Sequence, residues 1–427
     1  GRAGQQALQR SAYADAISNL GAAIDLLQRL PDGPERIQQE LLLQLAVARA
    51  LIPLKSRGAP DVERAYTRAR ELCERLGDPP ELFPVLLGLW AVHLLRGELR
   101  KAYELAERLL QRAQSAHDPA GLLYAQLALG ETSFWMGELL PAREHLELAI
   151  SIYDPERPLT FRYLGVDPRV FCLSYAAWTL WQLGYPDQAV KRGSEALALA
   201  QALSHPFSLG FAGLFVTLLH QFRREAPAAQ ETAESMIALC AEYGFTQILA
   251  YATVVRGWAI AEQGRNEEGI AQIREGLAIP VARSAVTRPY FLSLLAEACR
   301  ETSSLDDGLS ALTEALAAAD ENEIRFYEAE IHRLKGELLL RQDDSNATEA
   351  QNCFQHAVEI ARKQIAKSWE LRTTTSLARL LTKQGRRDEA RAMLAEIYNW
   401  FTEGFDMRDL VDAKVLLEEL QARPVLG

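Results

Sequence analysis

The chain has 427 residues, of which 48% are hydrophobic, 8% aromatic and 24% charged, and its formal net charge is -11 at pH 7. This length fits two to four compact domains or one repeat array, and the composition excludes a wholly disordered or collagen-like chain. The excess of 57 Asp and Glu over 46 Lys and Arg disfavours nucleic-acid binding, which usually requires a basic face. Abundant alanine and leucine with few strand formers predict an all-α protein.

A repeat of about 40 residues runs along the chain, starting near the N-terminus. A small residue is followed four positions later by a bulkier one and three positions after that by another small one, as in Ala16–Leu20–Ala23, Ala142–Leu146–Ala149 and Ala350–Phe354–Ala357. This spacing is typical of the tetratricopeptide repeat (TPR), in which small residues let two antiparallel helices pack closely. The first small residues of the second helices are predicted at positions 16, 65, 102, 142, 189, 229, 269, 308, 350 and 390.

The repeats predict an all-α, TPR-like α-solenoid superhelix of about ten antiparallel helix pairs. Turn signals separate the two helices of several pairs, for example Met-Gly-Glu at 136–138 and Leu-Gly-Tyr-Pro at 183–186. Because no low-complexity linker interrupts the pattern, residues 1–427 are expected to form one continuous solenoid. A loop is predicted as an insertion at 154–168, and a capping helix at about 407–421 is expected to cover the last repeat.

Cysteine usage and hydrophobic runs predict a cytoplasmic protein without a membrane segment. Even the two cysteines closest in sequence, Cys299 and Cys353, are 54 residues apart, so neither a zinc site nor a redox CxxC motif is predicted. No apolar run approaches the ~18 residues of a membrane span, and the first ten residues lack a signal-peptide core. A chain that begins at Gly1 instead of Met is expected to be a fragment of a larger protein.

The motifs that usually carry catalysis are missing from the sequence. There is no GxxxxGK[ST] or GxGxxG phosphate loop, no HExxH pair and no GxSxG elbow. A non-enzymatic protein with no metal and no cofactor is therefore predicted.

The aromatic residues of the first helices form the main candidate binding surface. In the TPR register, the concave face is lined by positions 2, 5, 9, 12 and 13 when the small residue of the first helix is position 8. Position 2 is aromatic in successive repeats, at Tyr124, Phe171, Phe211, Tyr251 and Tyr290. The later concave positions add Phe134, Trp135, Trp178, Trp181 and Trp258. Such a ladder could bind a peptide or ligand, or the longer helices could bury its rings between repeats; for Trp178 and Trp181 exposure is expected.

The same helix faces become ionic further along the chain. The charged residues on them are Glu297, Arg300, Glu330, Arg333, Glu337, Arg372 and Arg379. Because an unpaired buried charge is costly, these side chains are expected to face solvent or to pair across repeats. Arg300 and Arg333 complete the set of predicted partner-binding residues.

Several stretches resemble one bacterial family. These are residues 171–189, 205–225, 256–278, 288–299, 327–340 (YEAEIHRLKGELLL) and 367–390, followed by 397–420. They resemble the C-terminal TPR region of multidomain proteins in which a class III adenylate/guanylate cyclase domain, or another output domain, precedes a STAND-type signal-transduction ATPase. The resemblance implies that this array is the sensor or regulatory arm of a switch. The cyclase's metal-binding aspartates and the ATPase's phosphate loop have no counterpart in this sequence, so neither activity is expected here.

The favoured hypothesis is a non-catalytic TPR module that binds a partner protein, or another domain of its parent, through its concave face. The alternative is the sensor arm of a STAND-type regulator that binds a small molecule, such as a sugar or nucleoside stacked on Trp178 and Trp181. Neither nucleic acid nor a membrane is expected as a partner.

Overall fold

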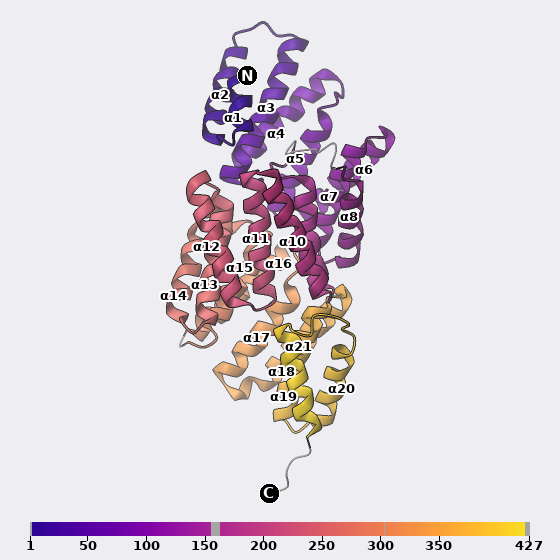
Figure 1. Ribbon diagram of the computed structural model, residues 1–427, viewed down its shortest axis with the longest axis vertical. Coiled ribbons are helices and arrows are strands. Elements are labelled where there is room, and N and C mark those ends of the chain that lie inside the picture. The colour runs from indigo at the N-terminus through magenta and orange to yellow at the C-terminus, as the bar shows by residue number, and fades with distance from the viewer. Residues whose placement is uncertain (1, 155–162, 303, 423–427) are drawn as a thin grey trace.

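The computed structural model describes residues 2–154, 163–302 and 304–422, and the regular secondary structure of this part of the chain is entirely helical. Ten antiparallel helix pairs follow one another and a single helix closes the array (Figure 1). The predicted fold class, a TPR-like α-solenoid with a C-terminal capping helix, is confirmed. Residues 155–162 of the predicted loop at 154–168 lie outside the described residues.

The odd-numbered helices up to α19 are the first members of the pairs. They are α1 (Arg2–Gln9), α3 (Pro34–Lys55), α5 (Leu82–Leu95), α7 (Pro119–Trp135), α9 (Pro168–Gln182), α11 (Pro206–Phe222), α13 (Thr246–Glu262), α15 (Arg288–Cys299), α17 (Glu328–Gln342) and α19 (Lys367–Lys383). The second members are α2 (Tyr13–Leu27), α4 (Pro60–Leu76), α6 (Leu99–Ser115), α8 (Leu139–Ile152), α10 (Pro186–Leu203), α12 (Ala226–Tyr243), α14 (Asn266–Ala278), α16 (Leu305–Glu321), α18 (Ala347–Gln364) and α20 (Arg387–Tyr398). The capping helix is α21 (Arg408–Gln421), and two short 3₁₀ helices, η1 (Pro280–Arg283) and η2 (Asp344–Asn346), lie in connections.

Small residues bring the two helices of a pair together, as the repeat pattern requires. All ten residues that the pattern marks lie in second helices and are buried. The closest approach is between α13 and α14, where a Cβ added to Gly257 would lie 2.7 Å from the carbonyl oxygen of Gly269. Only glycine at both positions allows this separation of the two backbones.

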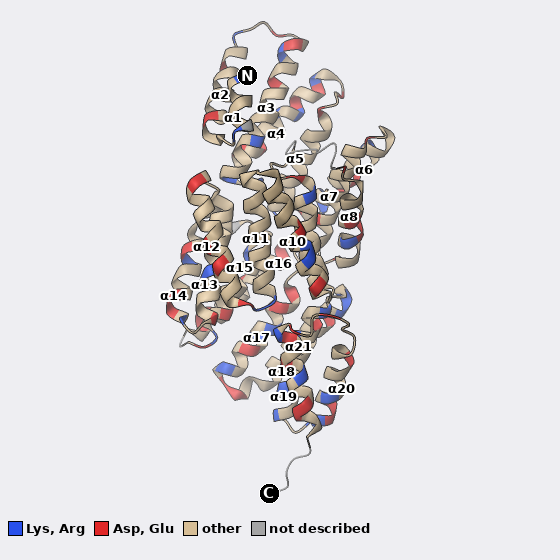
Figure 2. Cartoon of the chain, viewed as in Figure 1, with Lys and Arg blue, Asp and Glu red and all other residues tan. Residues whose placement is uncertain are grey.

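First and second helices differ in how they are buried. Nearly every side chain of α7, α9 and α19 is buried, whereas α6, α16 and α18 bury one face and expose the other. Figure 2 shows the same contrast in charge, because α11 carries no Lys, Arg, Asp or Glu at all. The first helices therefore line the superhelix axis, and the second helices form its outer wall.

Successive turns of the superhelix touch, and the contacts recur after about five repeats. α3 packs on α13, and α9 packs on α19. Carbonyl groups at the C-terminal ends of first helices accept hydrogen bonds from residues 187 to 190 positions later. Three such bonds join Ser284 Oγ to Leu95 O, Arg325 N to Trp135 O, and Ser368 Oγ to Trp181 O. The last carbonyls of a helix have no partner within it, and although Trp181 O also accepts the Gly184 N–H, the three bonds fasten one superhelical turn to the next.

The glycines of the turns between paired helices allow this contact between superhelical turns. Gly137 adopts φ of +76°, and a Cβ there would lie 2.6 Å from Nε2 of Gln364. Gly184 adopts φ of +91°, and its Cβ would lie 2.5 Å from the Trp400 ring. Glycine is therefore needed at these turns for two reasons: the backbone is left-handed, and a side chain there would collide with a distant segment.

The C-terminal cap also ties back to the middle of the chain. Glu403 accepts hydrogen bonds from the backbone N–H groups of Asp187 and Gln188 at the start of α10, and Asp187 accepts one from the Gly404 N–H. α21 packs on α19 and α20 and buries residues such as Leu410, while Val411 and Val415 stay exposed. The predicted cap is therefore present, and it also joins two parts of the superhelix.

Candidate binding sites along the superhelix axis

The inner faces of the first helices meet around a narrow apolar cavity. Its volume is about 60 Å³, which is room for only a few water molecules. Six of the predicted aromatic residues line it: Trp135, Phe171, Trp178, Phe211, Tyr251 and Tyr290. The TPR register thus selects residues from five different repeats that converge on one cavity.

The other four predicted aromatic residues do not reach the cavity. Tyr124 packs edge-on against Tyr163, with ring centroids 4.9 Å apart, and Phe134 packs against Phe326 at 5.3 Å. Trp181 stacks on Phe222 at 5.1 Å, and the indole Nε1 of Trp258 donates a hydrogen bond to Glu297 at 2.8 Å. These four rings are fully buried packing residues.

The expectation that Trp178 and Trp181 are exposed is wrong, because their exposed fractions are 5% and 0%. Trp178 stacks on Phe215 with 3.9 Å between centroids and donates from Nε1 to the Phe215 carbonyl oxygen. Trp181 meets Trp369 of the next superhelical turn edge-on at 4.6 Å. Trp178 is thus buried by neighbouring repeats, as the alternative interpretation expects, whereas Trp181 is also covered by the next superhelical turn, a contact that the repeat pattern does not encode.

The mouth of the cavity is formed by residues that remain partly accessible. Phe211 is half-buried and stacks between Phe171 and Phe215, with centroids 5.1 and 4.6 Å apart. Gln247, also half-buried, donates a hydrogen bond to the Tyr251 hydroxyl. Because the other residues that line the cavity are buried, a ligand that enters it would contact these two side chains first.

A buried ion pair lies beside the cavity. Arg57 donates two hydrogen bonds to Glu131, at 3.0 and 2.7 Å, and the Tyr175 hydroxyl donates a third to Glu131 at 2.6 Å. Burial and the Glu131 carboxylate raise the pKa of Tyr175 well above its ordinary value. The repeat pattern does not identify Arg57, because this residue lies in the turn after α3 and outside the helical register. The Glu131 carboxylate therefore already accepts three hydrogen bonds within the protein, and none of its oxygens is left without a partner for a sugar hydroxyl.

A second, polar cavity lies on the inner face of the last three repeats, and its volume is about 300 Å³. Its arginines come from the turns after α11 and α15 and from α17, α19 and α21: Arg224, Arg300, Arg333, Arg341, Arg372, Arg379 and Arg408. The carboxylates that line it are Glu301, Glu337, Asp409 and Asp412. We call this cavity the arginine pocket, and it contains both predicted arginines, Arg300 and Arg333.

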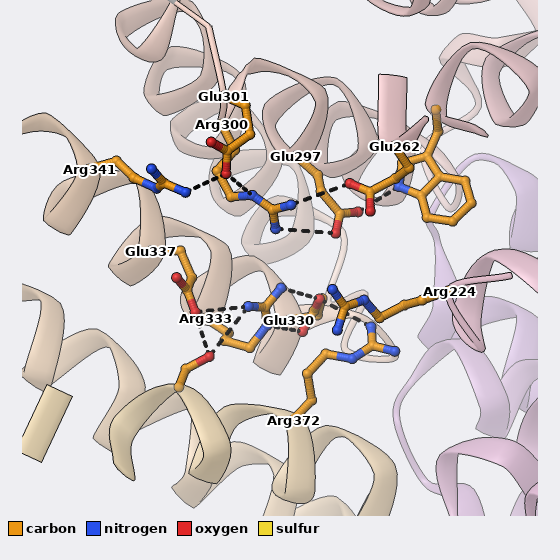
Figure 3. A network of polar contacts seen from close by, with 12 residues as sticks. Arg224, Glu262, Glu297, Arg300, Glu301, Glu330, Arg333, Glu337, Arg341 and Arg372 are labelled. Atoms are coloured by element: carbon orange, nitrogen blue, oxygen red, sulfur yellow. Dashed lines mark hydrogen bonds and ion pairs between the residues drawn. The ribbon is translucent and has the colours of Figure 1, made fainter. Parts of the chain in front are cut away.

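The ionic side chains pair across repeats, as their burial requires. Figure 3 shows two tiers, one around Arg300 and one around Arg333. In the first tier Arg300 contacts Glu262 of the preceding repeat at 3.4 Å, and in the second Arg372 contacts Glu330 at 3.3 Å. Pairing between repeats therefore supplies the partners that buried charges need.

Burial and pairing move the pKa values of the carboxyl groups in opposite directions. Burial and the neighbouring Glu297 raise the pKa of Glu262. Burial acts in the same direction on Glu337, but Arg333 and the Ser376 hydroxyl outweigh it and lower the pKa of that carboxyl. Glu337 is thus held as an anion, whereas Glu262 is easier to protonate.

The described residues contain no group of three or more His, Cys, Asp or Glu side chains placed to hold a metal ion. Within the same part of the chain, no helix is both long and apolar enough to cross a bilayer. The five cysteines are buried and unpaired, and burial raises the pKa of the Cys240 thiol to about 12.

The fold and the two cavities define this chain as a TPR-like α-solenoid, and comparison with known proteins agrees. No known family profile matches the sequence. An uncharacterized protein of Rhizobium meliloti (strain 1021) is 22% identical over 389 residues, which are 90% of this chain and 37% of that protein. The chain therefore spans little more than a third of that relative's length.

Solved structures with the same fold include several helical-repeat proteins. A Rap protein complexed with Competence and Sporulation Factor matches with a TM-score of 0.58 and 14% identity, over 90% of this chain and all of that one. The APC/C hetero-tetramer Cut9–Hcn1 matches at 0.54 with 11% identity, over 98% of this chain and 75% of that one. The Rap conjugation gene regulator of plasmid pLS20, in complex with the Phr* peptide, matches at 0.53 with 10% identity, over 92% of this chain and all of that one.

Proposed function

We propose that this chain is the non-catalytic, partner-binding regulatory module of a longer bacterial signalling protein. Its partner is a segment of another protein or of a neighbouring domain in the same parent, bound at the inner face of the superhelix. The observation that carries the proposal is the aromatic cavity, to which five repeats contribute rings and whose mouth is formed by half-buried Phe211 and Gln247.

Two comparisons support this proposal. The matched Rap protein is complexed with Competence and Sporulation Factor, and the matched Rap conjugation regulator with the Phr* peptide. The relative from Rhizobium meliloti is nearly three times as long as the matched region, with 37% covered, so a parent with further domains is expected. The resemblance of residues 327–420 to cyclase–STAND proteins suggests an ATPase and an output domain in that parent.

Regulation would follow from the contact between superhelical turns. The axial cavity, at about 60 Å³, is too small for a peptide, so binding requires the turns to move apart. Opening would break bonds such as Arg325 N to Trp135 O and lengthen the solenoid. A partner that binds only the open form shifts the population of the two forms, and the change in length would reach the neighbouring domains.

The experiment begins with affinity capture from host lysate, followed by binding measurements with the purified partner or parent domain. The test variant is Phe211→Ala at the mouth, and the matched control is Val190→Ala, a residue 40% exposed on α10. We expect Phe211→Ala to weaken binding by roughly tenfold and Val190→Ala to leave it unchanged. Equal affinity of both variants, or no partner above the bead control, would contradict the proposal.

A further inference from the structure

The arginine pocket contains more cationic than anionic side chains. Seven arginines and four carboxylates line its volume of about 300 Å³. Three more carboxylates, Glu262, Glu297 and Glu330, lie behind the arginines and balance the cluster as a whole. They are almost completely buried, with side-chain exposures of 11%, 4% and 1%. The seven arginines and seven carboxylates of the whole cluster therefore balance, while the lining of the cavity itself carries three more positive than negative side chains.

Glu330 holds the Arg333 guanidinium from one side and leaves its Nη1 weakly bonded. Arg333 donates from Nε and Nη2 to Glu330, both at 2.7 Å, whereas its Nη1 lies 3.3 Å from Glu337 and 3.5 Å from Ser376 Oγ. Arg372 is more fully bonded: Nε and Nη2 donate to Asp409 at 3.0 and 2.7 Å, and Nη2 also donates to the Phe222 carbonyl oxygen. Its long contact is that of Nη1 with Glu330, at 3.3 Å. Charge-assisted bonds to guanidinium usually measure about 2.7–2.9 Å, so the longer contacts leave donors for another acceptor.

Arg300 and Arg224 lack a short ion pair on any side. Arg300 reaches Glu262 and Glu301 at 3.4 Å and Glu297 at 4.0 Å. Arg224 reaches Asp409 at 3.4 Å and Asp412 at 3.3 Å. Each guanidinium carries five N–H donors, and these distances satisfy only part of that capacity.

The rim of the pocket carries two accessible arginines. Arg379 is exposed, and its closest carboxylate, Asp412, is 3.9 Å away. Arg408, at the first position of α21, is exposed and pairs with no carboxylate within 4.0 Å among the described residues. Because both side chains are exposed and the one ion pair that they form among the described residues, Arg379 with Asp412, is 3.9 Å long, both can turn toward an anion at little cost.

We propose that the arginine pocket binds a small molecule that carries two or more phosphate groups. The guanidinium groups converge from the turns after α11 and α15 and from three further helices, so their N–H groups approach from several directions. A tetrahedral phosphate accepts from several directions at once, and arginine's fork matches it bidentately. A planar carboxylate accepts mainly in one plane, and four such groups already occupy the wall.

The site differs from the aromatic mouth, so its ligand goes beyond the proposed function and can be tested separately. α21, which seals the last repeat, contributes Arg408, Asp409 and Asp412 to the pocket. A ligand that bridges α21 and α17 would stabilise the C-terminal closure of the solenoid. The site therefore suits an effector that reports the supply of a phosphorylated metabolite.

The test is isothermal titration calorimetry of the whole chain with pyrophosphate and with ATP, at fixed ionic strength. The variant Arg379→Ala/Arg408→Ala removes two rim charges, and both residues are exposed, so the fold should be kept. The matched control Arg265→Ala/Arg386→Ala removes two charges whose side chains are 57% and 41% exposed and lie outside the pocket. Circular dichroism and melting temperature without ligand check the folding of each variant.

We expect wild-type chain to bind one pyrophosphate or one nucleotide saturably, with citrate clearly weaker. The rim variant should lose roughly tenfold in affinity, about 1.4 kcal/mol, and the control less than twofold. Three outcomes would overturn the proposal: no saturable binding of either phosphate ligand at millimolar concentration, equal losses in both double variants, or citrate binding as tightly as pyrophosphate. None of these outcomes affects the capture experiment at Phe211, because the two sites share no residue.

Discussion

The two cavities occupy equivalent inner faces of the same solenoid, yet one is closed by aromatic rings and the other is kept open by charges. Around the first, rings such as Trp178 and Phe215 stack at 3.9 Å, and the cavity left is about 60 Å³. Around the second, arginines and carboxylates face one another across about 300 Å³. The repeat register therefore decides which positions face the axis, and the side-chain type decides whether those positions pack tightly or surround a polar cavity.

One residue joins the two regions. The Arg372 guanidinium lies 5.4 Å from the Trp181 ring centroid and 4.9 Å from that of Trp369, and it donates to the Phe222 carbonyl oxygen. It also pairs with Asp409 on the side of the arginine pocket. Because a guanidinium both stacks on indole rings and pairs with carboxylates, arginine suits the boundary between an apolar and an ionic axis.

The largest expected loss of stability comes from removing one of the buried aromatic rings near the aromatic cavity. Trp181→Ala deletes a fully buried indole that packs on Phe222 and Trp369. We expect the free energy of unfolding to fall by about 3–5 kcal/mol, measured by urea denaturation followed by circular dichroism. In the arginine pocket, Arg379→Ala should cost less than about 0.5 kcal/mol. Similar losses for the two variants would mean that the axis is not packed differently in the two regions.

Removing a charge beside the aromatic cavity should lower the free energy of unfolding more than removing one beside the arginine pocket. Glu131→Gln leaves the Arg57 guanidinium buried without its ionic partner, and we expect a loss of about 3 kcal/mol. Glu262→Gln should cost less, about 1 kcal/mol, because its contact with Arg300 is 3.4 Å long and burial already raises the pKa of Glu262. Urea denaturation of both variants at neutral pH gives the comparison, and a larger loss for Glu262→Gln would reverse it.

A smaller loss of stability is expected at acid pH, and two half-buried histidines, His205 and His332, contribute to it. Burial lowers the pKa of His205 to about 4, and its Nδ1 accepts a hydrogen bond from the Ser208 N–H at the start of α11. Burial lowers the pKa of His332 in α17 to about 4 as well. In the unfolded chain both titrate near the ordinary value of about 6.5. Between these values the unfolded state binds more protons than the folded one, so stability falls as pH drops from 6.5 to 4.

We expect each histidine to contribute on the order of 1–2 kcal/mol to that loss, given its partial exposure. The free energy of unfolding, measured at several pH values between 4 and 7, checks this. His205→Asn keeps a side-chain acceptor at the start of α11 and should flatten the curve by the His205 share, leaving that of His332. An unchanged slope in this variant would show that His205 is not the group that titrates.

Much of the fold follows from local sequence patterns. Small residues at positions such as Ala142 and Gly269 fix where two helices touch, and glycines such as Gly137 fix the turns, because only small side chains permit these distances and backbone angles. The register also placed six aromatic residues that do line one cavity, and Arg300 and Arg333 that do line the other. These features depend on neighbours within one or two repeats, so the sequence alone determines them.

The contacts between distant repeats follow only from the tertiary structure. The superhelix turns once in about five repeats, and a small rotation per repeat, summed over the array, brings Trp135 to Arg325 and Trp181 to Ser368. No pattern within a repeat encodes that sum, so the sequence does not predict the packing of Trp181 on Trp369, nor the pairing of Arg57 with Glu131, 74 residues away. The arginine pocket has the same origin, because α21 and the turn after α11 meet α17 only after the chain has wound around its axis.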